Sequence, residues 1–117
     1  MRVHVSHENI IPVLDLFQRD VHDTAVSKGW WSGHYRSAAE CIALMHSELS
    51  EALEAARSDY PDDEHCPEFG NFEIEMADVV IRVLDYCAHK GVSLAAALVA
   101  KAEFNKSREY KHGGKKF

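Results

Sequence analysis

The segment from Asn71 to Lys90 is apolar at nearly every position except along one polar stripe. The stripe recurs every three or four residues, which places it on one face of an α-helix. Its members are Glu75, Asp78, Arg82, Asp85 and His89. A helix that is apolar on its other sides is usually buried on most of them. We therefore expect a largely buried helix whose acidic side chains have partners, because an unpaired buried charge is costly.

Three other segments also carry the signals of helices. Apolar positions recur at helical spacing along them, and Pro12 suits the first turn of the earliest one. Asn9 and Ser93 are suitable N-caps, and Ser37 with Glu40 forms a capping-box pattern. The expected helices span about 10–28, 37–57, 71–90 and 93–108.

No strand signal stands out along the chain, so the expected fold is all-α. We predict one domain over residues 1–117, a four-helix bundle-like structure that is completed by dimerisation. Residues 109–117 are expected to form a basic C-terminal tail.

The composition is that of an ordinary globular protein, with 46% hydrophobic and 27% charged residues. A net charge of −6 argues against a nucleic-acid partner. The three cysteines are odd in number and have no CxxC spacing, which favours free thiols in a reducing compartment. No signal peptide or membrane-spanning run is visible, so we expect a cytoplasmic protein with no membrane partner.

Two pairs of carboxylates are the strongest candidate for a functional site. Glu48 and Glu51 lie three residues apart on one helix face. Glu75 and Asp78 have the same spacing on the long apolar helix. Two antiparallel helices could bring the pairs together into an oxygen cage for a hard divalent cation such as Mg²⁺. The alternative for the first pair is a solvated helix face, and for the second pair it is internal pairing with Arg82.

A cationic face is the second candidate. Lys101, Asn105 and Arg108 stand at positions i, i+4 and i+7 of the last expected helix, and Lys111 extends the charge. A lysine and a forked arginine suit phosphate oxygens. The alternative is a solvated C-terminal turn, where cations also favour the helix dipole. A bound cation beside such a face would make a general kit for phosphoryl transfer.

Three motifs in order resemble those of MazG-like, all-α nucleoside triphosphate pyrophosphohydrolases. The residues that carry the resemblance are Ala43–Ala55 (ExxE), Glu75–Arg82 (ExxD) and Lys101–Arg108 (KxxxNxxR). The sequence Gly29-Trp30-Trp31 and the ending Tyr110–Phe117 are similar to those of a small phage and bacterial subgroup. Glu109 departs from the subgroup, where proline is expected.

This resemblance implies hydrolysis of a nucleoside triphosphate, a deoxynucleotide or a non-canonical one, to the monophosphate and pyrophosphate. It implies Mg²⁺, with Mn²⁺ as a substitute, held by the side chains of Glu48, Glu51, Glu75 and Asp78. It also implies that Lys101, Asn105 and Arg108 lie near the phosphates and that the protein forms a homodimer or homotetramer.

A mechanism follows as a hypothesis. Glu48 or Glu51 would orient or deprotonate the attacking water, and Lys101 with Arg108 would offset charge on the leaving pyrophosphate. Lys111 would add to the phosphate-binding face. Trp30 and Trp31 could stack the nucleobase, or they could cover the bundle or a dimer interface.

Two rival functions remain open. In the first, the chain is a non-catalytic helical dimerisation module whose acidic side chains are structural. In the second, it is a sensor that binds a nucleotide but turns it over slowly. Stabilisation by Mg²⁺ separates the first rival from an enzyme, and kinetics separates the second.

Overall fold

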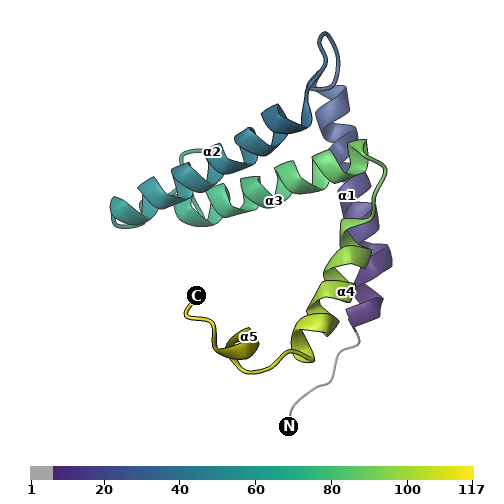
Figure 1. Ribbon diagram of the computed structural model, residues 1–117. Coiled ribbons are helices and arrows are strands. Elements are labelled where there is room, and N and C mark those ends of the chain that lie inside the picture. Colours follow the sequence, from purple (N-terminus) through teal and green to yellow (C-terminus); the bar gives the residue numbers. More distant parts are fainter. Residues whose placement is uncertain (1–6) are drawn as a thin grey trace.

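The computed structural model describes residues 7–117, and all of its regular elements are helices (Figure 1). They are η1 (His7–Asn9), α1 (Ile10–Ser27), α2 (Ala38–Arg57), α3 (Asn71–His89), α4 (Leu94–Lys106) and α5 (Lys111–Gly114). Within the described range there is no β-strand, and β-pairing is limited to an isolated bridge between Asp62 and Gly70. The all-α prediction is therefore confirmed, and each of the four expected helices ends within two residues of its predicted bounds.

The helix ends follow mostly from the capping residues. Ser37 Oγ accepts a hydrogen bond from the Glu40 amide at 3.1 Å, and Ser93 Oγ accepts one from the Ala96 amide at 3.0 Å. Asn9 does not cap α1 with its side chain, so that expectation was wrong. Its backbone is already helical because η1 runs directly into α1.

The helices form two arms that meet where α3 ends (Figure 1). The antiparallel pair α2 and α3 makes one arm, α1 crosses α3, and α4 packs along α1. Between α3 and α4 the chain bends by 114°. No single helix in residues 7–117 is long and apolar enough to cross a membrane. Only α3 and α4 taken together, across that bend, reach the required length and composition.

The apolar core of a single chain is small. Leu84 is the one large side chain that is fully buried among the described residues, and the rest of the core is mainly alanine. The expectation that the apolar helix is buried on most sides was wrong for the isolated chain. Met76, Val80 and Ile81 on α3 are exposed, because α2 and α1 cover only part of its surface.

The dimensions agree with this open arrangement. The chain exposes 9004 Å², whereas a compact monomer of its mass exposes about 6,400 Å². Its radius of gyration is 17.0 Å, against about 13 Å for a compact chain of this length. Large apolar side chains contribute to the extra surface, among them Val13, Leu16 and Leu53, each at least 60% exposed.

Candidate functional site

Three carboxylates from α2 and α3 converge on one point, and we call them the acidic cluster. The cluster consists of Glu48 and Glu51 on α2 and Glu75 on α3, with carboxylate oxygens within 4.8 Å of one another. The i,i+3 spacing on α2 and the antiparallel packing of α3 bring them together. Glu48 is only 9% exposed, so a solvated helix face does not describe it. Glu51 is exposed and Glu75 is half-buried.

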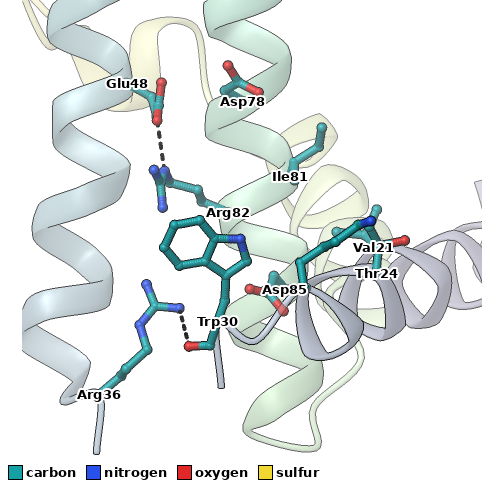
Figure 2. A pocket seen from close by; sticks show the side chains of 11 residues that line it. Val21, Thr24, Trp30, Arg36, Glu48, Asp78, Ile81, Arg82 and Asp85 are labelled. Atoms are coloured by element: carbon teal, nitrogen blue, oxygen red, sulfur yellow. Dashed lines mark hydrogen bonds and ion pairs between the residues drawn. The ribbon is translucent and has the colours of Figure 1, made fainter. Parts of the chain in front are cut away.

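Asp78 lies beside the acidic cluster, three residues beyond Glu75 on α3. Asp78 lines a neighbouring cavity and is not one of the three clustered carboxylates. Burial, and then the nearby charge of Glu48, raise the pKa of Asp78. Figure 2 shows Glu48 and Asp78 on facing helices. Of the four ligands expected from the sequence, the structure therefore brings three together and places the fourth next to them.

Crowding of like charges affects Glu75 most. Burial and the neighbouring Glu51 and Glu48 carboxyls raise the pKa of Glu75 to about 7. Its Oε2 atom is buried and has no hydrogen-bond partner. Buried polar atoms are almost always satisfied in folded proteins. A cation within the acidic cluster would satisfy this oxygen and relieve the repulsion between the carboxylates.

One cation of the chain already touches the acidic cluster. The Arg82 side chain donates from Nε to Glu48 Oε1 at 2.9 Å (Figure 2). Burial acts to raise the pKa of Glu48, but the hydrogen bond from Arg82 and the other nearby groups outweigh it and lower that pKa. Arg82 therefore forms its ion pair across to α2, and not with Glu75 or Asp78 on its own helix.

Asn71 and Asp63 form a polar clasp that holds Glu75. Asn71 Nδ2 donates to Asp63 Oδ1 at 2.8 Å and to Glu75 Oε1 at 3.3 Å. Asp63 is 4% exposed, and its Oδ2 also accepts from the backbone amides of His65 and Cys66. The hydrogen bond from Asn71, followed by the one from the Cys66 amide, lowers the pKa of Asp63. Sequence reasoning missed Asn71, although its position four residues before Glu75 places both on one helix face.

A cavity of about 360 Å³ opens beside Glu48 and Asp78, between α1, α2 and α3 (Figure 2). This volume lies within the range of small-molecule sites. Its walls combine apolar surface with charges of both signs. The lining residues are Val21, Thr24, Ala25, Lys28, Trp30, Arg36, Glu48, Asp78, Ile81, Arg82 and Asp85.

The two tryptophans have different places in this region. Trp31 Nε1 donates to Asp85 Oδ1 at 2.9 Å, and its ring stacks on His89 with centroids 4.0 Å apart. The same Asp85 oxygen lies 2.7 Å from His22 Nδ1, so Trp31 is built into the packing of α1 against α3. Trp30 is 64% exposed and lines the cavity. Of the two alternatives for the tryptophans, Trp31 therefore covers the helical bundle. The ring of Trp30 is exposed at the cavity, where a ligand could contact it.

The cationic face predicted on α4 lies away from the acidic cluster. Lys101 Nζ lies 4.8 Å and the Arg108 guanidinium carbon 5.5 Å from the centre of the Phe104 ring. Neither residue lines the cavity, nor do Asn105 and Lys111. The 114° bend directs α4 along α1 and away from the α2–α3 arm (Figure 1). Within one chain, the structure does not bring these residues to the carboxylates.

A scan of the sequence against protein-family models finds no match. Searches of curated proteins and of solved structures find no significant match either. The chemistry of the site is therefore the basis for a functional proposal.

Proposed function

We propose that this protein is a Mg²⁺-dependent nucleoside triphosphate pyrophosphohydrolase of the MazG-like kind. It would hydrolyse a deoxynucleoside or non-canonical nucleoside triphosphate to the monophosphate and pyrophosphate. The observation that carries the proposal is the convergence of Glu48, Glu51 and Glu75 within 4.8 Å at the side of a cavity. Glu48 and Asp78 both line that cavity, so a metal-bound ligand could occupy it.

The residues present fit a hard divalent cation. All the donors of the acidic cluster are carboxylate oxygens, which Mg²⁺ and Mn²⁺ prefer over the nitrogen and sulfur ligands typical of zinc. The buried and unsatisfied Oε2 of Glu75 supports a cation there independently of the spacing of the acids. Asp78 would complete the ligand set.

The residues of the chain would then divide the work of hydrolysis. A bound metal supplies charge neutralisation at the phosphates and a more acidic water. Glu48 is buried, whereas Glu51 is exposed to water and makes no ion pair among the described residues. Glu51 is thus the better placed base: it would take the proton of the water that attacks phosphorus. The P–O bond to pyrophosphate breaks in the same reaction, and pyrophosphate leaves with that bonding pair.

The nucleoside would occupy the rest of the cavity. Trp30 offers an exposed ring for stacking, and Val21, Ala25 and Ile81 supply apolar wall. We infer no role for nucleic acid or membrane partners, and we place the protein in the cytoplasm, where nucleotides are abundant.

A homodimer or homotetramer is part of the proposal. A second copy would cover the apolar surface left open on α1, α2 and α3. The excess area of about 2,600 Å² over a compact monomer is large enough for a stable interface. Assembly could also carry Lys101, Asn105 and Arg108 of one copy to the acidic cluster of another, which the bend before α4 prevents within one chain.

The proposal is tested by pyrophosphate release from a panel of canonical and modified NTPs and dNTPs. We expect release with Mg²⁺, less or comparable release with Mn²⁺, none with EDTA, and a preference among bases. A folded protein that releases no pyrophosphate from any member of the panel would contradict it.

The uncovered apolar surface also favours a second candidate, a non-catalytic dimerisation module, and the acidic site would equally suit a nucleotide sensor. A pure dimerisation module would not be stabilised by Mg²⁺. A sensor would be stabilised by Mg²⁺ with a nucleotide but would show no multiple turnover in the same panel.

A further inference from the structure

The cavity contains three cations of its own that the motif pattern did not reveal. Lys28 comes from the C-terminal end of α1, Arg36 from the loop before α2, and Arg82 from α3. We propose that Arg82 and Arg36, assisted by Lys28, bind the phosphates of the ligand. We further propose that Arg82 leaves Glu48 for the phosphate oxygens when a divalent cation enters the acidic cluster. This inference rests on the proposed function for the class of ligand, an inorganic or nucleotide polyphosphate.

Arg82 is close enough to Glu48 to pair with it and also lines the cavity where the phosphates would bind. Its Nε lies 2.9 Å from Glu48 Oε1, and its side chain is 36% exposed within the cavity. Figure 2 shows it between Glu48 and the ring of Trp30. A divalent cation bound to Glu48 would repel the guanidinium and replace its charge on that carboxylate. The freed group presents forked N–H donors, which match phosphate oxygens.

Arg36 is held in the cavity wall by several contacts. Its side chain is 9% exposed, and its guanidinium lies 4.8 Å from the centre of the Trp31 ring. Arg36 Nη1 donates to the Trp30 carbonyl at 3.3 Å (Figure 2). Glu40 Oε2 lies 3.7 Å from Arg36 Nε. These contacts fix the position of the arginine, so it would bind an anion with little loss of side-chain freedom.

The two roles of Arg82 make an unusual prediction, because its removal should change two affinities in opposite directions. In Arg82→Ala, Mn²⁺ alone should bind about 3- to 10-fold more tightly, since the competing cation on Glu48 is gone. Inorganic pyrophosphate in the presence of saturating Mg²⁺ should bind at least about 10-fold more weakly, since a charged hydrogen-bond partner is lost. Both affinities are measured by isothermal titration calorimetry, and Mn²⁺ binding also by electron paramagnetic resonance.

Arg57→Ala is the matched control, because Arg57 is exposed on α2 and lies outside the cavity. It should leave both affinities unchanged. Arg82→Lys keeps the charge without the fork, so it should retain near-normal Mn²⁺ binding and lose part of the pyrophosphate affinity. This variant, and Arg36→Lys, keep the test available if the alanine variant does not fold.

The inference would be overturned if Arg82→Ala left both affinities within twofold of wild type, or weakened both equally as a purely structural arginine would. It would also be overturned if the wild type with Mg²⁺ bound no pyrophosphate. Failure of the proposed function gives a different result. Opposite changes in Mn²⁺ and pyrophosphate affinity without turnover of any nucleotide would sustain the role of Arg82 and reject the hydrolase.

Discussion

The α2–α3 hairpin and α4 carry the two sets of charges that the sequence singled out, and the fold treats them differently. On the hairpin, Glu48 is buried, its partner Arg82 lies 2.9 Å away, and Asn71 holds Glu75. On α4, Lys101 is exposed, and its Nζ lies 4.8 Å from the centre of the Phe104 ring. Two facing helices fix one another's side chains, whereas a helix packed on one side leaves its charges in water. Under the proposed function, the hairpin would be a preformed half of the site, and α4 would be the half that needs a second chain.

The largest effect should come from breaking the preformed half. Glu51→Gln removes a proposed metal ligand that is also the proposed base, and the exposed position of Glu51 spares the core. We expect kcat to fall at least about 1,000-fold with helicity unchanged, measured by pyrophosphate release and circular dichroism. Glu54→Gln, on the same helix but outside the acidic cluster, should stay within about twofold of wild type. Normal activity in Glu51→Gln would show that the active site does not lie on the α2–α3 hairpin.

The dependence of α4 on a partner can be tested by mixing two inactive chains. Lys101→Ala should lower kcat/KM about 100-fold, because the proposed assembly places its charge near the phosphates. If the acidic cluster and Lys101 of each site come from different chains, mixing Lys101→Ala with Glu51→Gln should restore about a quarter of wild-type activity in a randomly assorted dimer. Restoration is read from activity after subunit exchange. Its absence in a stable dimer would contradict a site that is shared between two chains.

A smaller effect should follow from loosening the clasp on Glu75. Asn71→Ala removes the hydrogen bonds to Asp63 and Glu75. Because a residue that orients a ligand acts through that ligand, we expect Mn²⁺ affinity to fall about 10-fold. Titration calorimetry measures it, and a thermal melt in EDTA should show a loss of about 1–2 kcal/mol. A loss of stability with unchanged Mn²⁺ affinity would limit Asn71 to a structural role in the loop.

The smallest effect concerns pH. The pKa of Glu75 is raised from 4.5 to about 7 in the fold, so its protonated form is favoured there. Without metal, its stabilising contribution is complete below about pH 4.5 and is lost as pH rises through about 7. The change should be of the order of 1 kcal/mol after allowance for solvent screening. Glu75→Gln should flatten this part of the stability profile, as followed by thermal melts in EDTA.

Deprotonation of Glu75 should lower stability in the absence of metal but should strengthen metal binding. A ligand must be deprotonated to hold a cation, so Mn²⁺ affinity should increase from pH 6 to pH 8 in the wild type. A pH-independent affinity over this range would show that Glu75 does not bind the metal in its charged form.

Local pattern was enough to locate the helices and the acidic pairs. Ser37 and Ser93 cap as their types suggest, and the i,i+3 spacing of Glu48 and Glu51 places them on one face without reference to the rest of the chain. The buried state of Glu48 was not readable in this way. It depends on Arg82, which comes 34 residues later and could have paired as well with acids on its own helix.

The sequence by itself determined where each helix begins and ends and which residues share a helix face, because hydrogen bonds, caps and periodicity act over a few residues. Tertiary structure decided the rest. It set Trp31 against Asp85 and left Trp30 free, chose Glu48 as the partner of Arg82, and turned α4 away at a 114° bend. These outcomes depend on how helices cross and which side chains meet there, and no spacing along the chain encodes that directly.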